Sequence, residues 1–366
     1  MKFNCNGLTL AEAVLKVSKA CAVRTTAPVM ECIKITAKGD GISLLATDGE
    51  LSIEKQIDAE IFEEGAVCVP GKLFTDFIGK LSGEEVCVST GDKNVEIAYR
   101  DSKSYIQAIS AEEFPAINLE VSENSFALKQ KVFKDIVADT VFCCAQDDSR
   151  PILKGSLLEL GDKLTVTALD GYRLAVSETD ILSKSGETSL ICPARTLNEI
   201  SKMLTGEEDE EVILYEDGGQ LLVKSEGTTI VSRLYRGEFI QRDSVIPKKF
   251  STTVTVDRNE LISSAERASI LNRGDKNNLV TVEIISDKVR ITSVSDYGTV
   301  DETVEAETDG VDLTISMNAK YLLDALRALK EEKIVISLNG AISPFILQNQ
   351  EKKDSLYLIL PVRNAS

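Results

Sequence analysis

The sequence predicts an α+β protein in which one domain, built from two helices packed against antiparallel sheets, is repeated three times. Three observations lead to this prediction. The chain has 366 residues, which is enough for two or three domain cores. Two short markers recur along it at intervals of 122 to 126 residues. The composition, with 43% hydrophobic and 27% charged residues, is typical of a globular protein.

The first marker is a short strand that runs into a helix after a proline or a small residue. It occupies 67–74, 190–197 and 314–321. The basic residue inside it lies at Lys72, Arg195 and Lys320, at intervals of 123 and 125 residues. The second marker is a turn around Asp48, Asp170 and Asp296, at intervals of 122 and 126 residues. Two markers in phase indicate a triplicated domain.

The remaining elements follow the same period. Apolar residues at helical spacing predict helices at 10–24, 71–81, 129–144, 194–204, 257–273 and 318–333. In the last of these, the apolar face is formed by Leu322, Leu323, Ala325, Leu326 and Leu329. With the turns between them, each repeat reads β-α-β-β-β-α-β-β-β. Pro115 and Pro247 mark the boundaries, since proline ends a strand, and the predicted domains are 1–119, 120–247 and 248–366.

The residue types argue against an enzyme. The chain has no histidine, which removes the commonest general base and the Ser-His and Cys-His nucleophile systems. A stretch resembling a phosphate loop, from Gly65 to Lys72, has five residues between its glycines instead of four and continues with Leu73. The eight cysteines include no CxxC pair, so a metal or disulfide framework is not expected. We expect no catalytic residue, metal or cofactor; catalysis by carboxylates or lysine is the alternative.

The N-terminus and the hydropathy pattern indicate a cytoplasmic protein. The sequence begins Met1-Lys2-Phe3-Asn4, without the apolar region of a secretory signal. No run of residues approaches the length of a membrane span.

The distribution of charge points to nucleic acid, although the net charge of −18 argues against it. The six predicted helical segments contain 17 basic and 11 acidic residues, and so carry +6 while the rest of the chain carries −24. This predicts a basic surface lined by equivalent helices; an ordinary solvated surface is the alternative for any single helix. With 5% aromatic residues and no tryptophan, a stacking platform for single strands is not expected. The remaining mode of nucleic-acid binding is contact with the phosphate backbone, independent of base sequence.

Several stretches, in this order and spacing, resemble one known family. They are Met1–Phe3, the segment around Arg24 and Pro28, 150–155, 167–175, 267–271, 321–330 and 358–363. Over essentially the whole chain, the sequence is similar to the beta subunits of bacterial DNA polymerase III, the sliding clamps. The resemblance implies three clamp domains per chain and a head-to-tail homodimer that closes a ring around duplex DNA. It also implies a processivity factor and not an enzyme.

The resemblance further implies three groups of functional residues. The dimer interface would pair Tyr105 and Ile106 of one chain with Ile270 and Leu271 of the other. The DNA-binding residues would be Arg24, Lys72, Arg150, Arg195, Lys202, Lys320 and Arg327. A hydrophobic cleft would be lined by Leu153, Leu169, Gly171, Tyr172, Arg173, Leu174, Val245, Leu358, Leu360, Pro361, Val362 and Arg363. It would bind short peptides of the polymerase III catalytic subunit, the clamp loader, other DNA polymerases and repair proteins.

Some residues depart from the family pattern and leave the peptide preference open. Ser244 stands where arginine is common, Ile240 where proline is common and Tyr172 where histidine is frequent, and Asn364–Ser366 extend the chain end. Taken without the resemblance, the terminal strand 358–362 is equally compatible with an ordinary core strand. Two rival identities also stay open: the replicative clamp itself, or a duplicate of it that confers drug tolerance.

Overall fold

The computed structural model describes residues 1–81, 83–272 and 278–363. The chain forms two compact units, and each unit takes part of the central repeat. Unit 1 consists of Met1–Lys131, Leu182–Gly186 and Glu199–Leu234. Unit 2 consists of Val132–Ile181, Glu187–Asn198 and Tyr235–Ser366.

Unit 1 contains two antiparallel sheets, and one of them joins the first repeat to the central one. The strands of the first repeat are β1 (Lys2–Asn6), β2 (Cys32–Lys38), β3 (Gly41–Thr47), β4 (Leu51–Asp58), β5 (Glu60–Glu63), β6 (Gly65–Pro70), β7 (Glu85–Thr90), β8 (Asn94–Tyr99) and β9 (Ser102–Gln107). Those of the central repeat are β10 (Ser125–Lys129), β14 (Ser183–Ser185), β16 (Glu211–Asp217), β17 (Gln220–Ser225) and β18 (Thr228–Arg233). The strand orders are β5-β1-β7-β8-β9 and β14-β10-β16-β17-β18-β4-β3-β2-β6. The repeats meet where β18 pairs with β4, from Thr228↔Lys55 to Ser232↔Leu51.

Unit 2 is built on one antiparallel sheet that joins the central repeat to the third. Its strands are β11 (Gly155–Leu160), β12 (Lys163–Leu169), β13 (Arg173–Asp180), β15 (Thr188–Pro193), β19 (Thr252–Asp257), β20 (Leu279–Ile285), β21 (Lys288–Ser295), β22 (Gly298–Gly310), β23 (Leu313–Asn318), β24 (Lys333–Leu338), β25 (Phe345–Asn349) and β26 (Ser355–Ile359). Their order is β15-β11-β12-β13-β26-β25-β24-β19-β22-β21-β20-β23. The junction is the pairing of β13 with β26, from Arg173↔Ile359 to Ser177↔Ser355.

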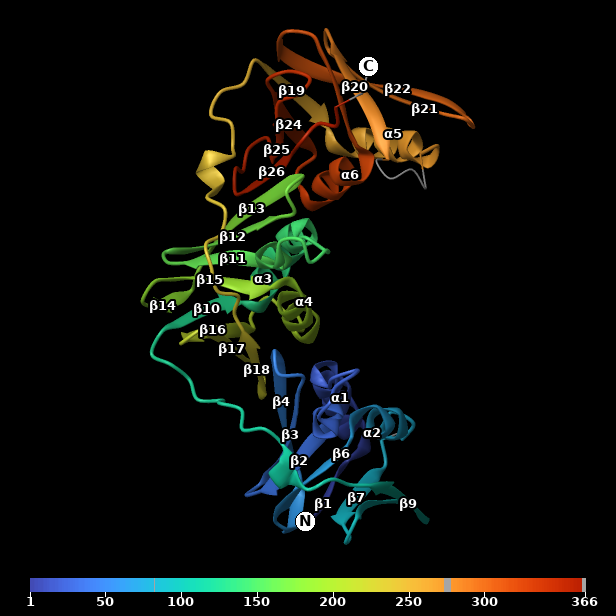
Figure 1. The fold of residues 1–366 in the computed structure, drawn as a ribbon, viewed down its shortest axis with the longest axis vertical. Helices are drawn as coiled ribbons and strands as arrows, with labels where there is room; N and C mark the ends of the chain where they lie inside the picture. The colour runs from blue at the N-terminus through green and yellow to red at the C-terminus, as the bar shows by residue number, and fades with distance from the viewer. Residues whose placement is uncertain (82, 273–277, 364–366) are drawn as a thin grey trace. The chain divides into compact units, whose positions relative to one another are not determined.

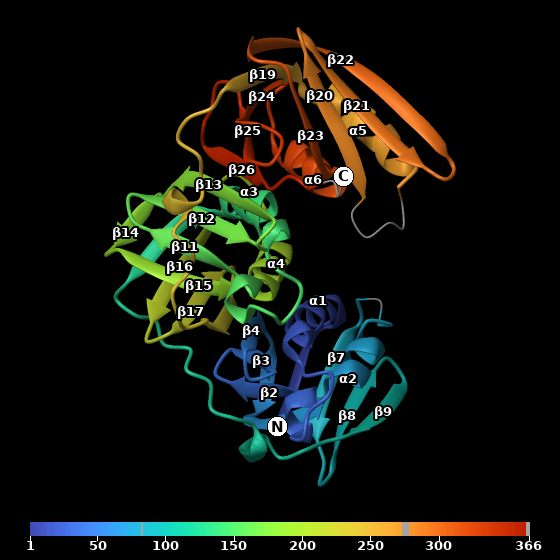
Figure 2. The same ribbon diagram turned by 45° about the horizontal axis from the view of Figure 1, so that its top comes forward.

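The described residues form six α-helices, two in each repeat. They are α1 (Gly7–Val17), α2 (Gly71–Ile78), α3 (Gln130–Thr140), α4 (Ala194–Met203), α5 (Arg258–Ile270) and α6 (Ala319–Ala328). Short 3-10 turns are η1 (Ser18–Ala20), η2 (Pro28–Glu31), η3 (Ala111–Glu113), η4 (Val141–Cys143), η5 (Pro151–Lys154) and η6 (Arg242–Ser244). In unit 1, α1 and α2 lie side by side, and in unit 2, α5 lies beside α6 (Figures 1 and 2).

Local sequence explains where these helices begin and which face they bury. Asn6 accepts hydrogen bonds from the backbone N–H groups of Leu8 and Thr9 and so caps α1. Asp257 and Asn318 cap α5 and α6 in the same way. The apolar face predicted for the last helix is confirmed. Its five predicted residues, Leu322, Leu323, Ala325, Leu326 and Leu329, are all buried.

The turns of the second marker are produced by aspartate and glycine. The Asp48 carboxylate accepts hydrogen bonds from the N–H groups of Glu50 and Leu51, at 3.0 and 2.9 Å. Gly49 supplies the positive φ, of 91°, that a side chain would disfavour. Asp170 and Gly171 repeat this arrangement in the central repeat, with a φ of 94°. The recurring Asp-Gly pairs are therefore turn-forming residues, as the sequence indicated.

Two predictions about the elements are wrong in part. Each repeat has more strands than predicted, because the turn marker opens a hairpin whose second arm is β4, β13 or β22. The helices are also shorter than predicted. As folded they contain 10 basic and 8 acidic residues, a net charge of +2 and not +6. Basic residues such as Arg24, Lys80 and Lys330 lie beyond the helix ends. Lys80 and Lys330 come two residues after α2 and α6, where the negative end of the helix dipole favours a cation.

Candidate nucleic-acid and partner surfaces

Three of the predicted DNA-binding residues occupy the same place in their repeats. Lys72, Arg195 and Lys320 each lie in the first turn of the second helix of a repeat, α2, α4 and α6, and each is exposed. The N-terminus of a helix is its positive end, so a cation there does not stabilise the helix. The recurrence of a basic residue at this position is therefore not explained by helix stability.

The other four predicted DNA-binding residues are exposed as well. Arg24 lies between η1 and η2, Arg150 directly precedes η5, Lys202 lies in the last turn of α4, and Arg327 in that of α6. Arg24, Lys72 and Lys202 belong to unit 1 and the rest belong to unit 2. Within unit 2, Lys320 and Arg327 line one hollow of about 540 Å³ between α5 and α6.

Some of these cations already have carboxylate partners. Lys202 pairs with Glu199 at 2.8 Å, Lys320 with Asp324 at 3.4 Å, and Arg327 with Glu266 at 2.7 Å. Such exposed pairs typically contribute about 0–1 kcal/mol, so a phosphate can displace them at little cost. Arg24, Lys72 and Arg150 have no ion pair among the described residues.

An apolar cluster in unit 2 contains five of the residues predicted to line the peptide cleft. Four of its buried side chains form a row across adjacent strands, because Leu169 on β12 faces Leu174 on β13, Leu174 faces Leu358 on β26, and Leu358 faces Ile346 on β25. Leu153 and Ala145 complete the buried part. Partly buried residues packed against it are Ile152, Val176, Phe239, Ile240, Ile246, Phe250, Leu356 and Leu360.

The other predicted cleft residues lie around this cluster and are more exposed. The Tyr172 side chain is 64% exposed and stands on the turn that follows Gly171. Val245 and Arg363 are exposed, and Pro361 and Val362 are partly buried. Two backbone hydrogen bonds of 2.8 Å hold the segment that follows β26, one from Leu360 N to Tyr172 O and one from Val362 N to Ser316 O.

Arg173 differs from the other predicted cleft residues because it is buried, with 7% of its surface exposed. Its guanidinium group contacts Asp170 at 3.1 Å and Asp324 at 2.7 Å, and donates a 2.7 Å hydrogen bond to the Phe142 carbonyl. It also lies over the rings of Tyr321 and Phe142, at 4.5 and 5.3 Å from their centroids. The donors of Arg173 are thus directed to α6, to η4 and to Asp170 on its own turn.

The predicted dimer residues lie on separate units of the chain. Tyr105 is 60% exposed on β9, an outer strand of its sheet, whereas its neighbour Ile106 is 5% exposed and faces the core. Ile270, at the end of α5, is 54% exposed and Leu271 is half-buried. Beside α5, residues 298–305 of β22 pair with β21, and the pairing of β22 with β19 begins only at Ala306. Among the described residues, the first half of β22 and the outer strand β9 therefore each leave one edge without a strand partner.

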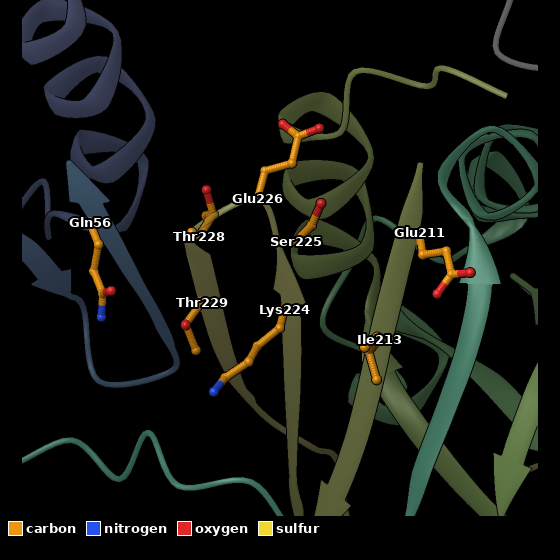
Figure 3. Close-up of a pocket in the computed structure, with 9 residues that line it drawn as sticks. Gln56, Glu211, Ile213, Lys224, Ser225, Glu226, Thr228 and Thr229 are labelled. Carbon is orange, nitrogen blue, oxygen red and sulfur yellow. The ribbon is translucent and has the colours of Figure 1, made fainter. Parts of the chain in front are cut away.

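The structure offers little for covalent chemistry. Burial raises the pKa of the Cys5, Cys21 and Cys68 thiols to about 12, so they are poor nucleophiles. A hollow of about 310 Å³ lies beside β17 and β18, but its charged groups do not converge: Lys224 and Glu226 point in opposite directions (Figure 3). In the described ranges, no group of three His, Cys, Asp or Glu side chains is arranged to hold a metal ion. No helix in that part of the chain is long and apolar enough to cross a membrane.

The sequence did not predict most of the partly buried side chains that pack against the apolar cluster. Phe239, Ile246 and Phe250 come from the connection between β18 and β19, which has no helical or strand period. The available signal was the presence of several large apolar residues in an otherwise polar connection. Asp324, which pairs with Arg173, was also missed.

Comparison with known proteins defines the class to which this fold belongs. Family models of the DNA polymerase III beta subunit match in all three parts: the N-terminal domain over residues 1–118, the central domain over 127–241 and the C-terminal domain over 243–363. The chain belongs to the DNA polymerase III beta subunit family, the beta sliding clamps. It is therefore a processivity factor, a non-catalytic polymerase subunit with three α+β clamp domains.

Individual relatives match over nearly the full length. The beta sliding clamp of Staphylococcus epidermidis is 32% identical over 357 residues, covering 94% of each chain. The DNA polymerase sliding clamp of Bacillus subtilis superposes with a TM-score of 0.96 at 29% identity, over 100% of this chain and 99% of that one. A putative DNA polymerase III beta subunit from Eubacterium rectale superposes with a TM-score of 0.95 at 32% identity, over 100% of both chains.

Proposed function

We propose that two copies of this chain join head to tail into a closed ring that encircles duplex DNA without reading its sequence. The domains of each copy would be 1–119, 120–247 and 248–366. The proposed binding of DNA rests on one observation, the basic residue in the first turn of α2, α4 and α6. At a helix N-terminus, a phosphate is attracted both by the backbone N–H groups and by the basic side chain. One such position in every repeat gives equivalent phosphate contacts around a ring.

The open strand edges support the assembly. β9 carries the exposed Tyr105, and β22 lies beside α5, which carries the exposed Ile270. Pairing β9 of one copy with the first half of β22 of the other would satisfy both edges and would repeat the β18–β4 and β26–β13 junctions within the chain. A head-to-tail contact that closes generates a ring. Since Ile106 faces the core of its own chain, Tyr105 would make the direct contact.

The apolar cluster is proposed as the cleft that binds short peptides. Its row of Leu169, Leu174 and Leu358 forms a floor, and Tyr172, Val245 and Val362 stand beside it with exposed surface. The peptides would come from the polymerase III catalytic subunit, the clamp loader, and other DNA polymerases and repair proteins. The site of action would be the cytoplasm, where these partners replicate DNA.

Retention on circular DNA tests the ring. The chain is loaded by a clamp loader onto a nicked plasmid, and half of the sample is then cut once with a restriction enzyme. We expect retention on the circle and release from the linear form, since the hold is topological. Equal retention on both forms, or tight binding to one short duplex that is insensitive to salt, would contradict the proposal.

A further inference from the structure

The position of Arg173 holds a different type of residue in each of the three repeats. Three residues after the turn aspartate, the first repeat has Leu51, the central repeat has Arg173 and the third has Thr299. Leu51 and Arg173 are both buried, at 1% and 7% exposure. A buried arginine costs several kcal/mol unless its charge is compensated, whereas a buried leucine stabilises the fold. The arginine in the central repeat thus needs a partner that the first repeat does not.

Asp324 on α6 supplies that partner from the third repeat. Its Oδ2 atom lies 2.7 Å from Nη1 of Arg173 and 3.4 Å from Nζ of Lys320. Acidic residues recur at the matching positions Asp76 and Glu199, so a carboxylate four residues after the basic residue is a general feature of the second helix. The shorter contact in α6 is with Arg173, and the Lys320 side chain is 65% exposed. The buried contact with Arg173 therefore dominates at Asp324.

The contacts continue from Arg173 to the edge of the apolar cluster. Its Nε atom donates to Oδ2 of Asp170 at 3.1 Å. The other oxygen of Asp170 accepts hydrogen bonds from Tyr172 N at 2.8 Å and Arg173 N at 3.0 Å. The Tyr172 carbonyl in turn accepts from Leu360 N at 2.8 Å. In both views of the ribbon, β13 lies beside β26 with α6 next to them (Figures 1 and 2).

We propose that Asp324, which lies on α6 outside the apolar cluster, is a positioning residue for partner peptides. It holds the Arg173 guanidinium, and through Asp170 it holds the turn that carries Tyr172 and anchors Leu360. This proposal rests on the peptide-binding role of the cluster proposed above. Tyr172 and the segment from Leu360 to Arg363 touch the peptide; Asp324 does not.

The test compares Asp324→Asn with a matched variant, Asp139→Asn. Asp139 on α3 is a carboxylate of similar exposure, 13% against 21% for Asp324, and it also joins the central repeat to the third by pairing with Lys330 at 2.8 Å. Among the described residues, its carboxylate pairs with Lys330 and makes no hydrogen bond or ion pair with the Asp170 to Arg173 turn. Both variants lose one ion pair between the same repeats, so both should lower the melting temperature, and only Asp324→Asn should loosen the turn.

The first measurement is titration of a fluorescently labelled peptide copied from the tail of a bacterial polymerase III catalytic subunit. We expect Asp324→Asn to weaken binding roughly tenfold, because a charged hydrogen bond is lost from a group that must stay fixed. Asp139→Asn should change the affinity less than twofold, and Asp324→Glu should recover part of the loss. Dimer mass and retention on circular DNA should stay as in the wild type.

A spectroscopic measurement separates positioning from general destabilisation. The chain has no tryptophan, so a Tyr172→Trp variant has one tryptophan on the turn, which can be excited selectively over the remaining tyrosines. Its anisotropy without peptide should fall when Asp324→Asn is added and stay unchanged with Asp139→Asn.

Three outcomes would overturn the proposal in distinguishable ways. A wild-type chain that does not bind the peptide removes the cleft function and this proposal with it. If Asp324→Asn binds the peptide with wild-type affinity, the positioning role of Asp324 is refuted and the cleft function stands. Equal weakening by Asp324→Asn and Asp139→Asn means that the loss comes from the joint between the repeats and not from the turn.

Discussion

Replacing Ile270 by aspartate is the most direct test of the proposed ring. Ile270 ends α5 and is 54% exposed in the single chain. A polar residue in its place therefore removes little from the core of the chain, and we expect the folding stability to change by no more than about 1 kcal/mol. In the dimer, the same carboxylate would be buried against the partner without a cation assigned to it.

The magnitude follows from burial. Burying the exposed half of an isoleucine stabilises each interface by about 1 kcal/mol, and this is lost. An unpaired carboxylate taken out of water adds a penalty of at least about 2–3 kcal/mol. A head-to-tail dimer has two identical interfaces, so the sum is roughly 6–8 kcal/mol. This corresponds to a weakening of the dimer dissociation constant by about four to six powers of ten.

Mass measurement in solution decides the result. The single chain has a mass of 39.9 kDa, so the wild type should appear at about twice this value and the variant as the monomer. Ile342→Asp is the matched control, because Ile342 is 67% exposed in the same repeat but lies between β24 and β25, outside the proposed interface. A variant of Ile270 that stays dimeric at micromolar concentration, or a control that dissociates equally, would refute the reasoning.

Three further predictions concern the DNA surface, the apolar cluster and a helix cap. Replacing Lys72 or Arg24 by glutamate should lower retention on circular DNA modestly and reduce the salt dependence of DNA contact by about one phosphate, measured as log K against log salt; an unchanged slope would place both residues away from DNA. Leu174→Ala and Val362→Ala should each weaken peptide binding about tenfold or more without changing the dimer mass, and unchanged titrations in both would mean that the peptide binds elsewhere. Asn6→Ala should destabilise unit 1 by about 1 kcal/mol, seen as a lower melting temperature, since it removes hydrogen bonds of 2.9 and 3.2 Å to the first turn of α1.

The sequence predicted those features that local chemistry determines. An aspartate followed by glycine forms a turn whatever surrounds it, so the turns at Asp48 and Asp170 were recognisable. The buried face of α6 was equally clear, because five apolar residues at helical spacing allow one amphipathic arrangement. Strand alternation also determines which of the two predicted dimer residues on β9 is exposed. Neighbouring residues of a strand face opposite ways, so Tyr105 and Ile106 could not both have been exposed on β9.

Features that depend on tertiary contacts were not predictable. Helix ends depend on where the next segment packs, and periodicity alone extended the first helix to Arg24 although α1 ends at Val17. Apolar residues of an irregular connection, such as Phe239 and Phe250, follow no helical or strand period, so the sequence does not predict where their side chains pack. The partner of Arg173 lies 151 residues away along the chain, and nothing in the local sequence of either residue specifies the pair.

Triplication offers a way to separate residues that build the fold from residues that serve one site. Features found in every repeat, such as the turn aspartate and the basic residue at the start of the second helix, belong to the shared framework or to a function that all repeats share. Arg173 departs from the shared pattern, because the equivalent residue in the first repeat is the buried Leu51. A single repeat that accepts a buried charge where its sister has an apolar side chain loses hydrophobic stabilisation at that position. The same repeat places Tyr172 on that turn and contributes Leu169 and Leu174 to the apolar cluster. The departure from the repeat and the proposed partner site thus coincide, which is the reason to expect that Arg173 and Asp324 serve that site and not the fold alone.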